Sequence, residues 1–208
     1  MRQIILAILA LATAGAAPVH AQQHGSMPPA KAPRGLVLNA HAFAMPGFSI
    51  DGPDVDTPID ISSGPGAGAQ VGYAFSPRYM IYAGADLGRL GAAAEDGGGH
   101  WGLGMLELGG RMSFPKAASR LTPYVTGTVG LRGLGAKVAD FGTVKLHGMA
   151  LSGGGGITYA LSPNTSLNAA AVVTMGKFGH YEDPGQSFDV NVNNTLSTRL
   201  QFGLDWRP

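Results

Sequence analysis

Apolar and polar residues alternate most regularly near the C-terminal end of the chain. One parity carries Leu196, Thr198, Leu200, Phe202, Leu204 and Trp206, and the other carries Asn193, Thr195, Ser197, Arg199, Gln201 and Asp205. A period of two is typical of a β-strand with one apolar face. The segment is also long enough to cross a bilayer at a tilt. We therefore predict a membrane-spanning strand over residues 193–206.

Seven earlier segments follow the same period. They lie near 35–45, 67–76, 78–89, 101–114, 122–134, 144–161 and 165–177. The contrast between the two faces is weakest in 35–45, where Ala40 and Ala42 alternate with other residues, and in 144–161, because of the glycines at 153–156. Eight strands return both ends of the chain to one side, as closure of a bacterial barrel requires. The expected fold is an all-β, eight-stranded antiparallel transmembrane barrel over 35–206.

The connections between these segments alternate strictly in length. Short links that contain proline lie at 76–77, 115–121 and 162–164, and long links lie at 46–66, 90–100, 135–143 and 178–189. Transmembrane barrels have tight periplasmic turns and long outer loops. We therefore expect periplasmic N- and C-termini and exposed long loops.

Alternation alone would also fit a soluble barrel whose apolar face points inward. Five aromatic residues on the apolar face, all beside the short turns, favour the membrane instead. They are Phe75, Tyr79, Phe114, Tyr159 and Trp206. Aromatic side chains at one level form the girdle that a bilayer interface favours. Tyr124 departs from this pattern, because its parity points into the barrel.

Composition and the N-terminus agree with export to a membrane. Charged residues make up 13% of the chain, against roughly 25% in soluble domains, and the mean hydropathy is only +0.11. Such values suit strands that are apolar on one face. Arg2, the apolar stretch 4–17 and the small residues before Gln22 predict a signal peptide over 1–21. Residues 22–34 are rich in Pro, Ala and Gln and predict a flexible lead-in.

The chain resembles the OmpA-type outer-membrane β-barrel superfamily of Gram-negative bacteria. The resemblance rests on the alternating segments, the turn at 76–79 (Ser-Pro-Arg-Tyr) and the closing stretch 201–206 (Gln-Phe-Gly-Leu-Asp-Trp). It implies insertion into outer-membrane lipid and recognition of the last strand by the barrel-insertion machinery. Arg207 and Pro208 follow Trp206, where that family usually ends on an aromatic residue. The chain stops at its eighth strand, so we expect no peptidoglycan-binding domain.

Catalytic chemistry has weak support in the sequence. Small outer-membrane barrels include lipid A deacylases and acyltransferases, which need a serine, a histidine base and an orienting acid. His41, His100, His147 and His180 are scattered, and no His-x-Ser pair lies on a strand. The acidic residues at 51–60 fail the spacing of a calcium-binding EF-hand. We assign no catalytic residue, metal site or cofactor.

Charges are distributed unevenly between the two ends of the expected barrel. The long loops carry most of the acidic residues. Four cations stand where those loops meet the barrel, at the expected depth of lipopolysaccharide phosphates: Arg89, Lys137, Lys145 and Lys177. Ammonium and guanidinium groups pair well with phosphate, and ordinary loop solvation is the alternative. Nothing indicates binding to nucleic acid.

Charged residues on the inward parity predict a network inside the barrel. They are Asp86, Glu107, Arg111, Arg132, Arg199 and Asp205. The turn at 115–121 places Glu107 opposite Gly130 and diagonal to Arg132, so we expect Glu107 to pair with Arg132 or Arg111. Contact with trapped water is the alternative. Side chains largely fill an eight-stranded barrel, which favours a structural or surface-interaction protein. A narrow solute channel and a lipid A-modifying enzyme remain alternatives.

Overall fold

The computed structural model describes residues 34–50, 59–91, 100–117, 119–138, 142–182 and 187–208. It confirms the predicted fold class, a closed antiparallel barrel of eight strands in chain order. The strands are β1 (Gly35–Ile50), β2 (Ile59–Ala74), β3 (Tyr79–Gly91), β4 (His100–Ser113), β5 (Leu121–Val138), β6 (Gly142–Ala160), β7 (Thr165–Glu182) and β8 (Ser187–Trp206). Each strand pairs with the next, and β1 pairs with β8 to close the barrel. No helix long and apolar enough to span a membrane occurs among the described residues.

The two faces of the barrel follow the predicted parity. On β4, Leu106 and Leu108 are 59% and 62% exposed on the outside, whereas Glu107 between them is buried at 8%. Tyr124 is buried inside the barrel, as its parity predicts. An apolar exterior with charged groups inside is the reverse of a soluble barrel and is the arrangement that lipid requires.

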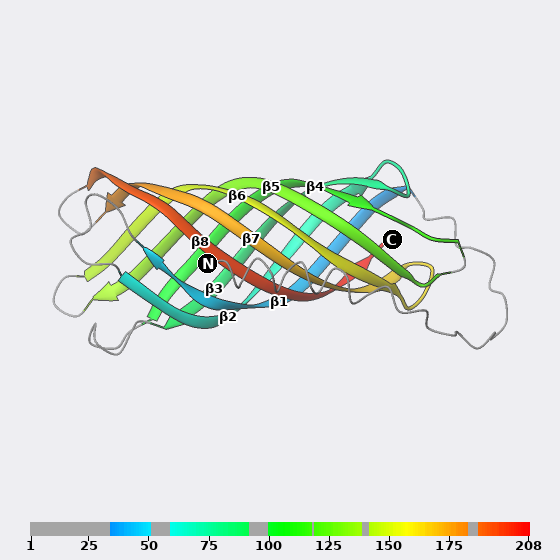
Figure 1. The fold of residues 1–208 in the computed structure, drawn as a ribbon, viewed down its shortest axis with the longest axis horizontal. Helices are drawn as coiled ribbons and strands as arrows, with labels where there is room; N and C mark the ends of the chain where they lie inside the picture. Colours follow the sequence, from blue (N-terminus) through cyan, green and yellow to red (C-terminus); the bar gives the residue numbers. More distant parts are fainter. Residues whose placement is uncertain (1–33, 51–58, 92–99, 118, 139–141, 183–186) are drawn as a thin grey trace, which may run out of the picture.

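The strands extend further toward the long loops than the sequence indicates. β1 continues to Ile50 and β2 begins at Ile59, so much of the predicted loop 46–66 is strand. β7 likewise runs to Glu182, and β8 begins at Ser187. Figure 1 shows these extensions at the left end of the barrel, opposite the C-terminus. Residues 1–33, which include the predicted signal peptide and most of the lead-in, lie outside the described residues, as does loop segment 51–58.

An apolar cluster inside the barrel explains these longer strands. Near the long loops the inward side chains are apolar: Phe43, Met45, Phe48, Ile50, Ile61, Leu90, Leu103, Met105, Leu134, Leu146 and Phe178. Burying these side chains against one another stabilises strands that extend beyond a membrane-spanning length. We call this group the apolar plug. Nearer to the short turns the interior is largely polar, apart from a smaller apolar cluster of Val37, Ala74, Met80 and Tyr82.

The five predicted girdle aromatics lie on the outside, at the strand ends beside the short turns. Their side chains are 41–47% exposed: Phe75, Tyr79, Phe114, Tyr159 and Trp206. Phe75 and Tyr79 stack across the turn between β2 and β3, with ring centroids 6.0 Å apart. Within this turn Ser76 Oγ accepts hydrogen bonds from the backbone nitrogens of Arg78 and Tyr79.

Candidate functional site in the barrel lumen

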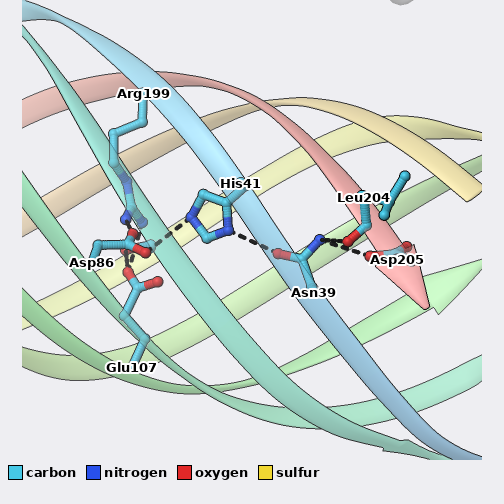
Figure 2. Close-up of polar contacts among 8 residues, drawn as sticks. Asn39, His41, Asp86, Glu107, Arg199, Leu204 and Asp205 are labelled. Carbon is cyan, nitrogen blue, oxygen red and sulfur yellow. Dashed lines mark hydrogen bonds and ion pairs between the residues drawn. The ribbon is translucent and has the colours of Figure 1, made fainter. Parts of the chain in front are cut away.

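A hydrogen-bonded chain of side chains runs along the polar part of the lumen (Figure 2). Asn39 Nδ2 donates to Asp205 Oδ1 at 2.7 Å and to the Leu204 carbonyl at 3.3 Å. The Asn39 Oδ1 atom therefore acts as an acceptor toward His41 Nδ1, which lies 2.7 Å away. His41 Nε2 lies 2.9 Å from Asp86 Oδ1, a second acceptor. Both ring nitrogens of His41 are therefore held by side-chain oxygens, one on Asn39 and one on Asp86.

Arg199 lies at the centre of this network. Its Nη1 donates to Asp86, and its Nη2 donates to Glu107 Oε1 at 2.6 Å. Ser152 Oγ donates to the same Glu107 oxygen at 3.2 Å and contacts Thr174 Oγ1 at 2.9 Å. Asp86, Glu107 and Arg199 are all buried. One guanidinium thus joins a carboxylate on β3 to one on β4 from the far strand β8.

The predicted partners of Glu107 were wrong, although the predicted register was right. Glu107 lies opposite Gly130 on β5, yet it pairs with Arg199 across the lumen. Arg111 instead pairs with Asp205 at 3.0 Å, and its guanidinium stacks 4.4 Å from the centroid of Tyr124. The lumen is narrow enough for long side chains to meet across it, and such contacts outcompete the diagonal pair expected along the sheet.

Arg132 stands apart from these ion pairs. Its guanidinium packs between Phe48, at 4.3 Å from the ring centroid, and Phe178, at 5.6 Å. Among the described residues it donates one hydrogen bond, to Thr195 Oγ1, which is long at 3.4 Å. Cation–π contacts contribute roughly 0.5–2 kcal/mol each, whereas burying an ion costs several kcal/mol. The aromatic contacts therefore offset only part of the cost of burying Arg132.

Glycine makes room for the pair between His41 and Asp86. Gly68 on β2 lies opposite His41 on one side and Asp86 on the other. A Cβ at this position would lie 1.9 Å from Asp86 Oδ1 and 2.7 Å from His41 Nε2. The two side chains therefore meet directly over a backbone that carries no side chain. This close approach is one physical reason for glycine in the barrel wall.

Little space remains between the polar side chains. A cavity of about 10 Å³ lies in the polar part of the lumen, about the volume that the centre of one water molecule needs. Its lining residues are Gln70, Tyr82, Glu107, Arg111, Tyr124, Thr126, Thr128, Ser152, Val172, Arg199 and Gln201. Several of these also form the ion pairs described above. The polar lumen is therefore a filled core in this conformation.

Comparison with known proteins agrees with this architecture. The profile of the family described as outer membrane protein beta-barrel domain matches residues 7–207. The chain belongs to this family. Three solved structures of outer-membrane barrels share its fold, and none of the curated proteins compared with the chain matches it. As a member of the family, the chain is an outer-membrane protein.

The structural relatives are distant in sequence. Neisserial surface protein A is 15% identical with a TM-score of 0.59, and the match covers 83% of this chain and 97% of that one. OprG from Pseudomonas aeruginosa is 17% identical with a TM-score of 0.52, covering 83% and 95%. Ail, the attachment invasion locus protein of Yersinia pestis, is 12% identical with a TM-score of 0.50, covering 83% and 97%. At these identities the likeness shows the fold alone.

The outer surface of this outer-membrane barrel carries an apolar band with cations at its far edge. On β3 the band runs from Tyr79 to Leu87 and ends at Arg89, and on β7 it ends at Lys177. Such runs match the roughly 9–11 residues with which a tilted strand crosses a bilayer. Lys145 lies beyond the band on β6, with its Nζ 3.9 Å from the exposed carboxylate of Glu182. The side chain of Lys137 lies outside the described part of the structure.

The histidines near this rim contact acids. His147 and His180 are register partners on β6 and β7, and their Nε2 atoms lie 3.9 and 3.8 Å from Glu182. His180 Nδ1 also lies 3.2 Å from Asp189. In the described part of the chain, no group of His, Asp and Glu is arranged to hold a metal ion.

Several members of the lumen network were not predicted from the sequence. Asn39, His41, Ser152 and Thr174 were not predicted to take part. On β1 the signal was present, because Asn39 and His41 share one parity and alanines occupy the other. Small outward alanines hid this strand's alternation, since they contrast little with polar neighbours.

Proposed function

We propose that this outer-membrane barrel is a closed, non-catalytic structural protein that supports envelope integrity or surface interaction. In this proposal the chain termini face the periplasm and the long loops face outward. The cations at the rim pair with lipopolysaccharide phosphates. The filled polar lumen is the observation that carries the proposal.

The contents of the lumen argue against a permanently open channel. Arg199 bridges Asp86 and Glu107 across the lumen, and Arg111 pairs with Asp205. The neighbouring cavity of about 10 Å³ holds little more than one water molecule. The apolar plug fills the other half of the interior. A solute would have to displace buried ion pairs and the apolar plug to pass.

The geometry of the histidines gives an enzyme little support. His41 uses both ring nitrogens on Asn39 and Asp86, which leaves neither free to take a proton from a serine. His147 and His180 face Glu182 at the rim. Lipid A modification would require a histidine base beside a nucleophile.

Planar-bilayer recording of the refolded barrel tests the structural function against the channel. We expect no stable open state for the wild type. A double variant, Glu107→Ala with Arg199→Ala, removes two long side chains from the polar half but leaves the apolar plug in place, so it should not conduct steadily either. Steady single-channel openings of the wild type would overturn the proposal in favour of the channel.

Mass analysis of lipid A from cells that overproduce the barrel tests the enzymatic alternative. We expect an acylation pattern identical to that of cells carrying an empty vector. Loss or gain of an acyl chain would overturn the non-catalytic function. A His41→Gln variant then shows whether the lumen histidine takes part in the reaction.

The lipopolysaccharide contact is tested by a rim variant, Arg89→Gln with Lys177→Gln. Both residues end the apolar band on the same side, so the variant should lose most of the heat stabilisation that purified lipopolysaccharide gives the wild-type barrel. Arg78→Gln, at the exposed turn between β2 and β3, is the matched control and should keep it. Equal stabilisation of all three proteins would contradict this contact.

A further inference from the structure

Arg132 differs from the other buried cations of the lumen in what it contacts. Arg111 pairs with Asp205, and Arg199 pairs with Asp86 and Glu107. Arg132 is only 2% exposed, and no described carboxylate pairs with it. The residue therefore carries a buried positive charge that the described part of the protein leaves uncompensated.

The carboxylates of the polar lumen already have hydrogen-bond and ion-pair partners. Asp86 contacts His41 and Arg199, and Asp205 accepts hydrogen bonds from Asn39, Asn168 and Arg111. Asp86 and Glu107 share Arg199, and Asp205 pairs with Arg111, so each of these acids already has a cationic partner. Moving one of them to Arg132 would break an existing ion pair.

The free atoms of Arg132 form one edge of its guanidinium. Nη1 donates the long hydrogen bond to Thr195, whereas Nε and Nη2 have no partner among the described residues. The Nε–H and Nη2–H bonds point in the same direction, so they present two parallel donors. Such a fork matches the two oxygens of a carboxylate. Arg199, the other fully buried arginine of the described lumen, donates from both Nη1 and Nη2 and leaves only Nε without a partner, so its fork is occupied.

The surroundings of Arg132 are apolar on the side of the long loops. Phe48 and Phe178 flank its guanidinium, and Met105 faces it across the β4–β5 pair. Met45 belongs to the same apolar plug. Methionine side chains are flexible and adapt to the shape of a bound group. A ligand whose charge meets Arg132 would therefore place the rest of its body among apolar side chains that can rearrange.

We propose that Arg132 anchors a binding site for a monovalent carboxylate with an apolar body, inside the loop-side half of the barrel. The carboxylate accepts hydrogen bonds from Nε and Nη2 and compensates the buried charge. The apolar body packs with Phe48 and Phe178 and displaces Met45 or Met105. A single negative charge suffices to pair with Arg132, because Asp86, Glu107 and Asp205 already have their own partners.

Benzoate is a suitable probe, because it joins a carboxylate to a compact apolar ring and dissolves well in water. The ¹⁵N-labelled barrel, refolded in detergent, is titrated while the Nε–H resonance of Arg132 is followed. Absence of that resonance in Arg132→Lys assigns it. We expect a saturable shift with benzoate and none with benzamide, the neutral analogue of similar shape.

Two substitutions and one control distinguish benzoate binding at Arg132 from non-specific effects on the stability of the barrel. Arg132→Met should abolish saturable benzoate binding while the barrel still folds, because it removes a charge that lacked a partner. Arg132→Lys keeps the charge but loses the fork, and should bind benzoate at least about tenfold more weakly. Arg78→Gln, at the exposed turn between β2 and β3, should bind benzoate like the wild type. In the variants, binding is followed by the benzoate dependence of the urea midpoint.

Several outcomes would overturn the proposal. Benzoate binding that survives in Arg132→Met would place the site elsewhere. A wild-type protein that shows no saturable response would remove the site, and equal binding of benzamide would mean that the pocket does not recognise charge. Saturation by chloride or inorganic phosphate that excludes benzoate would make this an inorganic-anion site and refute the carboxylate class.

Discussion

Asp86 contacts two basic side chains, His41 and Arg199, whereas Glu107 contacts one, Arg199. Asp86→Asn should therefore destabilise the barrel more than Glu107→Gln does. Leaving a buried cation without its carboxylate costs roughly 3–5 kcal/mol, and in the Glu107 variant Arg199 keeps Asp86. Urea unfolding of the refolded proteins measures both changes. Equal midpoints for the wild type and Asp86→Asn would show that the network contributes no stability.

Gly68 permits a contact that any side chain would obstruct. Gly68→Ala places a methyl group 1.9 Å from Asp86 Oδ1, so the pair with His41 must separate or the strands must move. Overpacking of this kind costs roughly 1–3 kcal/mol, which a lowered urea midpoint would reveal. Gly153→Ala is the control, because its added Cβ meets nothing within 4 Å. A Gly68→Ala barrel as stable as the Gly153→Ala barrel would contradict the tight packing at His41.

Along each strand, a charged side chain in the apolar outer band destabilises the barrel, because the band faces lipid. Leu108 lies on the lipid face of β4 and is 62% exposed, about halfway across the band. Leu108→Lys should destabilise the barrel by roughly 2–4 kcal/mol, as expected for lysine near the bilayer midplane. Thr143→Lys, exposed on β6 beyond the band, should change stability little. Folding titrations in lipid vesicles compare the two, and similar losses would mean that the band is misplaced.

The sequence predicts which face of each strand is apolar but not where the strands end. In the membrane the outward parity is apolar, and this reading holds for Leu106, Leu108 and their counterparts. Toward the long loops the inward side chains are apolar as well, because they form the apolar plug. On β1, inward Phe43 and Met45 alternate with outward Ala42 and Ala44, so the two faces contrast little. The alternation fades there, and these extensions were predicted as loops.

At the scale of the whole barrel, closure determines which lumen charges meet. Register between neighbouring strands follows from turn length, and Glu107 lies opposite Gly130 as predicted. The pair between Glu107 on β4 and Arg199 on β8 joins strands on opposite sides of the barrel. Which side chains span the lumen depends on the tilt and stagger of all eight strands. A single-strand pattern contains no information on that geometry, so the inward residues could be predicted and their partners could not.

The orientation of the barrel in the membrane follows from the lengths of its connections. Short turns lie at the end of the barrel that bears the C-terminus, and the apolar band ends in cations at the opposite end. Outer-membrane barrels have their short turns in the periplasm. An epitope inserted after Asp54 should therefore be stained by antibody on intact cells. An epitope added after Pro208 should be stained only after permeabilisation, and both proteins should keep the heat-dependent migration of a folded barrel. Staining of the Pro208 epitope on intact cells, with the Asp54 epitope hidden, would show that the barrel is inserted in the opposite direction.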